Sequence, residues 1–91
     1  MRTYPSIMAH RIPTRIPRTN EVSSFQTSDR KTVVAVVQNV GGGFRVYLSQ
    51  LRFDDEEAVY YWSDDMMPSA GVFGSVKTAK NESERLLGPL S

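Results

Sequence analysis

The stretch Lys31-Thr-Val-Val-Ala-Val-Val-Gln-Asn39 decides the fold, because it holds five consecutive apolar residues between two polar ends. Its β-branched side chains and its short length predict a strand rather than a helix. Successive side chains of a strand point to opposite faces, so the run from Val33 to Val37 makes both faces apolar. A strand of this kind is typical of the middle of a sheet that is covered on both sides.

Two further strands are predicted on the C-terminal side of this stretch. Gly41-Gly42-Gly43 predicts a hairpin turn, and Phe44 to Ser49 alternates apolar with polar side chains. The acidic turn Asp54-Asp-Glu-Glu57 then leads into Ala58-Val-Tyr-Tyr-Trp-Ser63. The three strands form an antiparallel meander between Lys31 and Ser63.

The flanking segments predict one more strand and one helix. Glu21 to Gln26 is a candidate leading strand, joined to the central strand by a loop over residues 27–30. Residues 64–71 have loop composition. A helix then begins after the N-cap Ser75 and ends at Gly88-Pro89. Its apolar stripe is expected to contain Val76, Ala79, Ser83, Leu86 and Leu87.

We therefore expect an α+β fold, in which a three- or four-stranded antiparallel meander carries one C-terminal helix on one face. An extended basic arm, residues 1–20, precedes this body, residues 21–91. Pro5, Pro13 and Pro17 prevent a helix in the arm. The near-repeat Arg11-Ile-Pro-Thr14, Arg15-Ile-Pro-Arg18 favours polyproline-like geometry, and a disordered tail is the open alternative.

Charge is divided unevenly along the 91 residues. Residues 1–31 carry six basic and two acidic side chains, whereas residues 32–91 carry five basic and eight acidic ones, for a total of +1. The chain has no cysteine, which fits a reducing, cytoplasmic interior. No apolar run approaches the roughly 18 residues that cross a bilayer, so no membrane segment is predicted.

The predicted elements leave one face of the sheet without a cover, because a single short helix shelters only one face. Either the arm folds back over the second face or another protein covers it, since a large exposed apolar patch is unusual for a monomer. A homodimer through this face is one form of the second possibility. The arm residues expected to provide the cover are Tyr4, Ile7, Met8, Ile12 and Ile16.

Catalytic chemistry is poorly represented in the sequence. His10 is the only histidine and lies in the predicted arm, and there is no cysteine, so we expect neither a Ser-His-Asp triad nor a two-histidine metal site within one chain. We expect a protein that is not an enzyme and that uses no cofactor or metal.

The segment Gly71 to Thr78 shares glycines and a Lys-Thr pair with a phosphate loop. That motif needs glycine directly before its lysine, but Val76 precedes Lys77. A weaker interpretation is an anion site made by Ser75, Lys77 and Lys80 at the helix start, and an ordinary capped helix is the alternative.

The acidic residues and exposed aromatic residues are the candidate contacts of a partner. Six carboxylates at the ends of the predicted strands could steer a basic partner, although they could also be a solvated edge or ligands of calcium, whose spacing rules they do not meet. The arm arginines could act as a strap around the same partner. The predicted partner-binding residues are Arg11, Arg15, Arg18, Tyr47, Asp54, Asp55, Glu56, Glu57, Tyr61, Asp64 and Asp65.

Two resemblances bear on function. The lead Gly71-Val-Phe-Gly-Ser75 into a helix after three strands is similar in outline to the arm-binding domains of phage integrases, which read DNA with a basic sheet. Here Arg45 and Arg52 lie beside a run of four acids instead. The general character also resembles small cysteine-free phage and mobile-element proteins, including anti-CRISPR proteins. We expect a non-enzymatic protein-binding module that inhibits a host nucleoprotein complex; the alternative is a small nucleic-acid-binding regulator whose arm contacts phosphates.

Overall fold

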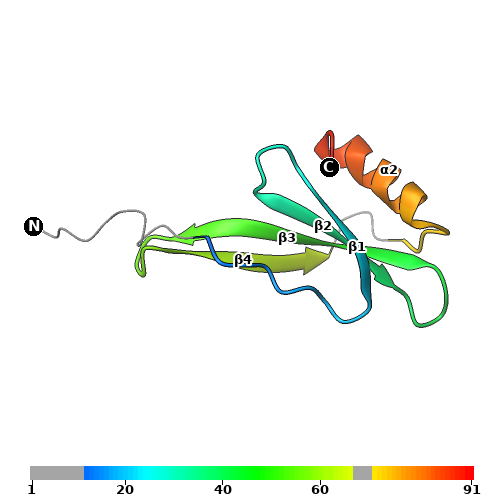
Figure 1. Ribbon diagram of the computed structural model, residues 1–91, viewed down its shortest axis with the longest axis horizontal. Coiled ribbons are helices and arrows are strands. Elements are labelled where there is room, and N and C mark those ends of the chain that lie inside the picture. Colours follow the sequence, from blue (N-terminus) through cyan, green and yellow to red (C-terminus); the bar gives the residue numbers. More distant parts are fainter. Residues whose placement is uncertain (1–11, 67–70) are drawn as a thin grey trace, which may run out of the picture.

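The computed structural model describes residues 12–66 and 71–91 and contains a four-stranded antiparallel sheet with one C-terminal helix. The strands are β1 (Glu21–Gln26), β2 (Thr32–Gln38), β3 (Phe44–Asp54) and β4 (Val59–Met66), in the spatial order β1-β2-β3-β4. The helix α2 (Val76–Leu87) lies across the sheet, and the β3–β4 hairpin reaches past it (Figure 1). The expected α+β meander is confirmed.

Strand register assigns every side chain to one of two faces. Val34 pairs with Leu48 and Val36 with Val46, and these four side chains lie under α2. We call this side the helix face. The residues between them, such as Ala35 and its partner Tyr47, point to the opposite side, which we call the arm face.

The core lies between the helix face and α2. Val34, Val36, Val46, Leu48, Ala79 and Leu90 are buried together, with Phe25, Phe44, Phe73, Val76 and Leu87 packed around them. Ser75 is the N-cap as predicted, because its Oγ accepts a hydrogen bond from the Thr78 N–H at 3.1 Å. At the other end, the Gly88 N–H donates to the Glu84 carbonyl at 2.8 Å. Leu86 belongs to the predicted stripe, seven residues after the buried Ala79, but in the last turn of α2 it is 48% exposed.

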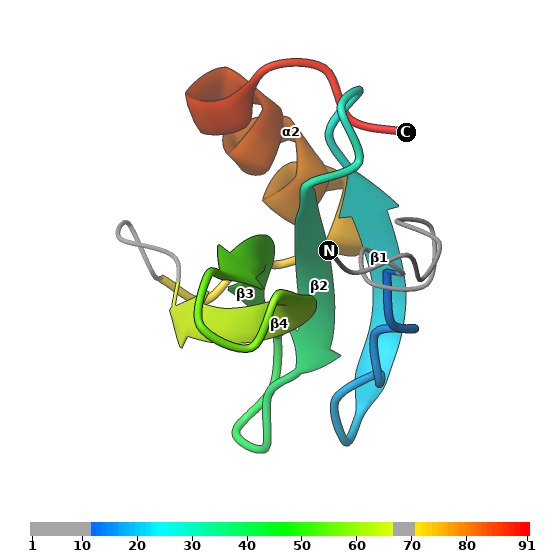
Figure 2. The same ribbon diagram turned by 90° about the vertical axis from the view of Figure 1, so that its left-hand side faces the viewer.

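The arm face is covered by the described part of the arm, residues 12–20. Figure 2 shows this segment, in dark blue, beside the sheet on the side away from α2. The isoleucines do not provide the cover as expected, since Ile12 and Ile16 are 58% and 84% exposed. Pro13, Arg15 and Arg18 make the contacts instead, as described below. Tyr4, Ile7, Met8, His10 and Arg11 lie outside the described residues, as do residues 67–70 of the predicted loop.

The last two strands are longer than the sequence pattern indicated. β3 continues to Asp54 and β4 to Met66, beyond the expected ends at Ser49 and Ser63. The cause is continuous pairing, which runs without a break from Tyr47↔Met66 to Asp54↔Val59. The hairpin between them therefore extends well beyond the part of the sheet that α2 covers (Figure 1).

Candidate functional site

The projecting part of the hairpin, residues 50–63, is the first candidate surface, and we call it the distal hairpin. On its helix face, Arg52 lies opposite Tyr61 and Asp54 opposite Val59. Val59 and Tyr61 are each 45% exposed, because α2 does not reach this far. The described residues thus leave an aromatic and an aliphatic side chain open to a partner on this face.

The aromatic residues on the other side of the distal hairpin pack together. Leu51 lies opposite Trp62, and Phe53 opposite Tyr60 on the arm face. The Phe53 and Tyr60 rings meet edge to face with centroids 5.0 Å apart. This packing makes the hairpin a firm support for its turn rather than a loose loop.

The turn of the distal hairpin is acidic and well defined. Asp54 Oδ1 accepts hydrogen bonds from the N–H groups of Glu56 and Glu57, at 2.9 and 3.3 Å. Ala58 completes the turn with a φ of 55°. Asp55, Glu56 and Glu57 are exposed. Asp54 therefore shapes the turn, and the other three carboxylates present negative charge at the tip.

One of the other predicted acids, Asp64, meets one of the arm arginines, Arg18, on the arm face. The Arg18 guanidinium lies 4.2 Å from the centre of the Tyr47 ring, and its NH2 is 3.8 Å from Asp64 Oδ1. The Ser49 hydroxyl donates to Asp64 Oδ1 at 2.5 Å. Arg18, Tyr47 and Asp64 thus form one cluster, as a shared site would require, but they contact one another. Asp65 is exposed on the helix face next to it.

Arg15 is held by Glu21, which the sequence did not single out. The two guanidinium NH groups donate to the two carboxylate oxygens at 3.1 and 2.6 Å, and the side chains are only 12% and 7% exposed. The Arg18 backbone N–H adds a third bond to Glu21 Oε1 at 3.1 Å. Burial acts to raise the pKa of Glu21, but these bonds and the positive charges of the two arginines outweigh it and hold the pKa below its usual value.

A groove of about 390 Å³ separates the arm from β4. The Trp62 Nε1–H donates to the Pro13 carbonyl at 2.8 Å and fixes the arm at one wall. The β4 wall carries aromatic side chains and an acid, and the arm wall carries aliphatic side chains and an arginine. The lining residues are Pro13, Thr14, Arg15, Ile16, Tyr60, Tyr61, Trp62 and Asp64.

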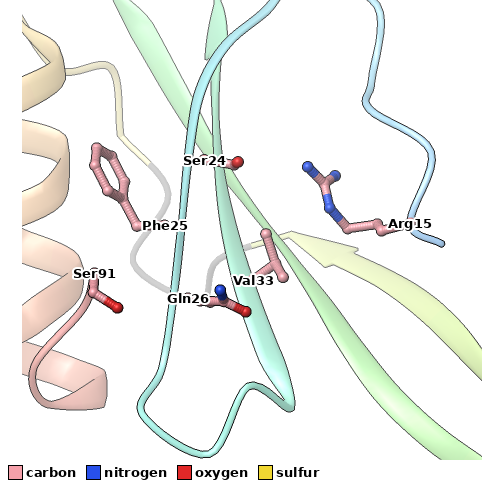
Figure 3. A pocket seen from close by; sticks show the side chains of 6 residues that line it. All are labelled: Arg15, Ser24, Phe25, Gln26, Val33 and Ser91. Atoms are coloured by element: carbon pink, nitrogen blue, oxygen red, sulfur yellow. The ribbon is translucent and has the colours of Figure 1, made fainter. Parts of the chain in front are cut away.

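A second, smaller hollow of about 160 Å³ lies where the arm passes β1, lined by Arg15, Ser24, Phe25, Gln26, Val33 and Ser91. Figure 3 shows Arg15 entering from the arm while the Phe25 ring points away, towards α2. The guanidinium of Arg15 is already paired with Glu21 and is not available to a ligand in this hollow.

The predicted anion site at the start of α2 contains three residues with separate roles. Ser75 uses its Oγ as the helix cap. The Lys80 ammonium lies 4.9 Å from the centre of the Phe25 ring, over the sheet, and Lys77 is exposed. The structure therefore places one lysine, rather than two, in the open near the helix start.

Within residues 12–66 and 71–91, no group of three or more His, Asp or Glu side chains could hold a metal ion. Over the same residues, the single helix is too short and too polar to cross a membrane.

Comparison with known proteins returned no match, either to a family model, to a curated protein or to a solved structure.

Two functional residues escaped the sequence interpretation. Trp62 was noticed as an aromatic residue of a strand, but its bond to Pro13 spans 49 positions and has no local signal. Glu21 did carry a signal, since it is one of two acids among the first 31 residues, beside six basic ones. An isolated acid next to an arginine repeat is a natural internal partner for it.

Proposed function

We propose that this chain is a non-enzymatic protein-binding module that inhibits a host nucleoprotein complex by masking one of its surfaces. One observation carries the proposal: the distal hairpin projects beyond α2, with Val59 and Tyr61 exposed behind an acidic tip. Exposed aromatic side chains beside a rim of charge are typical of protein-binding surfaces. The character of small phage and mobile-element proteins, anti-CRISPR proteins among them, agrees with this role.

The charge of the tip supports the choice of target. Protein surfaces that hold nucleic acid are basic, because they neutralise phosphates with lysine and arginine. Asp55, Glu56 and Glu57 offer such a surface negative charge at the end of a firm support. Charge of this kind favours rapid association and selects against acidic partners.

The alternative, a regulator that grips nucleic acid with its arm, receives less support. Both terminal nitrogens of the Arg15 guanidinium donate to Glu21, and the Arg18 guanidinium contacts Tyr47 and Asp64. Binding phosphates with these side chains would first require breaking their contacts. The acidic tip would also repel a nucleic acid backbone.

The test is capture of a partner complex from cells of the native host by the tagged full-length chain, followed by titration of the purified complex. Glu56→Lys and Tyr61→Ala are expected to weaken binding at least about tenfold, as for residues near the centre of an interface. The control variants are Glu82→Lys, a charge reversal at a half-exposed residue of α2, and Leu86→Ala, a side-chain truncation at an exposed one. The controls are expected to bind like the original chain.

Two results would refute the proposal. One is equal loss of binding in the α2 controls. The other is binding to generic duplex DNA with a steep salt dependence that disappears when Arg11, Arg15 and Arg18 are all replaced by alanine.

A further inference from the structure

We propose that the outer edge of β4 binds an extended peptide segment of the partner as an added strand, and that this segment carries a basic residue near each end. The inference rests on the proposed function, because it names where and how the partner is held. Four features carry it: backbone direction along β4, the state of the two sheet edges, the groove beside the arm, and the distribution of acids.

The backbone direction follows from one hydrogen bond. The Leu51 N–H donates to the Lys31 carbonyl at 2.8 Å, so Leu51 directs its backbone groups to the β2 side of β3. Backbone groups alternate in direction along a strand, so Gln50 and Arg52 point towards β4, where they meet Ser63 and Tyr61.

The residues of β4 that alternate with Tyr61 and Ser63 therefore point away from β3. Trp62 and Asp64 direct their backbone N–H and C=O groups to the outer edge of β4. Across residues 12–66 and 71–91, no backbone hydrogen bond reaches either residue from that outer side. Such an edge is a template for another strand.

The opposite edge of the sheet is partly protected, at the two ends of β1. The C-terminal residue Ser91 exchanges two backbone hydrogen bonds with Gln26 of β1, at 2.9 and 3.0 Å. A register shift between Glu21 and Ser23 adds an irregularity at the other end of β1. Bulges and covering segments are how proteins protect an edge from further pairing.

The groove lies beside the part of the edge that Trp62 and Asp64 form. Its lining includes Trp62 and Asp64 on the β4 side and Pro13 to Ile16 on the arm side. Neighbouring strands are separated by about 4.8 Å, so a groove of about 390 Å³ can receive part of an extended chain along this edge. The strongly exposed side chain of Ile16 offers that chain an apolar contact.

Acidic groups stand at both ends of the edge. The turn with Asp55, Glu56 and Glu57 precedes β4, and Asp64 and Asp65 lie near its end. Five residue steps from Val59 to Asp64 span about 17 Å at about 3.3 Å each. An extended segment with lysine or arginine near both ends, about five to seven residues apart, would match this pattern.

The same pattern argues against a second copy of this chain at the edge. Antiparallel self-pairing of β4 would place the acidic turn of one copy beside Asp64 and Asp65 of the other. Parallel self-pairing would place each acidic end beside the same acidic end of the second copy. Like charges opposite each other destabilise a strand pair, so the charge favours a basic peptide over self-association.

The experiment is selection of octapeptides from a random display library on the immobilised full-length chain. Selected peptides are then synthesised and titrated by the fluorescence of Trp62, the only tryptophan of the chain. We expect enrichment of a basic residue near each end, β-branched or aromatic residues between them, and a change in Trp62 emission on binding.

Backbone methylation of the peptide provides a matched control. Only every second amide of an added strand faces β4. Methylating the set of alternate amides that faces β4 is expected to weaken binding at least about thirtyfold, through two lost bonds and the bulk of the methyl groups. Methylating the other set leaves binding within about threefold. Replacing Asp65 by lysine is expected to weaken the original peptide and to be rescued by a glutamate at one peptide end.

The possible failures are distinguishable. Peptides without basic ends, equal effects of both methylated sets, or no enriched peptide would each overturn the edge inference. In those cases, weakening of the partner complex by Glu56→Lys and Tyr61→Ala would still support the proposed function. If Glu56→Lys and Tyr61→Ala also left binding to the partner complex unchanged, the edge inference and the proposed function would both be refuted.

Discussion

The Arg15–Glu21 pair is expected to hold the arm on the sheet and to contribute measurably to stability. The perturbation is a double-mutant cycle made of Arg15→Ala, Glu21→Ala and the two together. The molecule contains its own control, because Arg85 and Glu82 form a pair of the same type in α2. The control pair is far more exposed, with side chains at 69% and 29% against 12% and 7%.

The magnitude follows from burial and from the bonds that remain. Separating a fully buried pair costs about 3–5 kcal/mol, since it leaves an uncompensated charge behind. Here the arm can open to water and Glu21 keeps the Arg18 N–H at 3.1 Å, so we expect a coupling of about 1–2 kcal/mol. In the exposed control pair, solvent screens the two charges, so we expect a coupling energy too small to resolve.

The assay is urea denaturation followed by circular dichroism, with Trp62 emission recorded in parallel. Since Trp62 donates to the Pro13 carbonyl, its emission is expected to change when the arm leaves the sheet, even where the sheet is intact. The pH dependence has a definite sign. The pKa of Glu21 is lowered by folding, so its contribution is complete above about pH 5 and is lost as the pH falls through the folded value.

Two outcomes would refute this reasoning. A coupling between Arg15 and Glu21 no larger than that of the control pair would mean that the arm is not held by this contact. A coupling that stays constant from pH 7 to pH 3 would mean that ionised Glu21 is not the partner of Arg15.

Three further predictions concern the turns and the helix cap. Gly43→Ala is expected to lower the free energy of unfolding by about 1–3 kcal/mol more than Gly42→Ala does. Both glycines have a positive φ, but only at Gly43 would a Cβ lie 2.4 Å from Val72 Cγ1. Equal losses of stability in thermal unfolding would contradict this prediction. Ala58→Gly is expected to stabilise the chain by about 0.5–1 kcal/mol, because relief of the left-handed strain, about 1–2 kcal/mol, exceeds the added entropy of the unfolded chain, about 0.4–1 kcal/mol. A lower melting temperature of this variant would contradict the prediction. Ser75→Ala is expected to cost about 1 kcal/mol by removing the helix cap, whereas Ser75→Asp should restore most of it in the same assay.

Local patterns were sufficient for the elements themselves. The apolar run of β2 predicted a strand over residues 32–38, and the structure has it there. Ser75 and Gly88 predicted the two ends of α2 correctly. These features could be read from the sequence because each depends on side chains and backbone preferences within a few residues.

The lengths of β3 and β4 were harder to predict, although the sequence of β3 contains a relevant signal. Up to Ser49 its apolar residues lie on the helix face, as Val46 and Leu48 do, but beyond it Leu51 and Phe53 lie on the arm face. The change of face looks like the end of a strand when periodicity alone is considered. It marks instead the point where the cover passes from α2 to the arm.

The sequence by itself determined a meander with a central strand apolar on both faces, a capped C-terminal helix and a basic arm before an acidic body. Only the tertiary structure decided that the arm covers the second face, that Glu21 receives Arg15, and that Trp62 fixes Pro13. The physical reason is that such contacts depend on the twist and register of strands distant in the sequence, which bring together groups that have no local preference for one another.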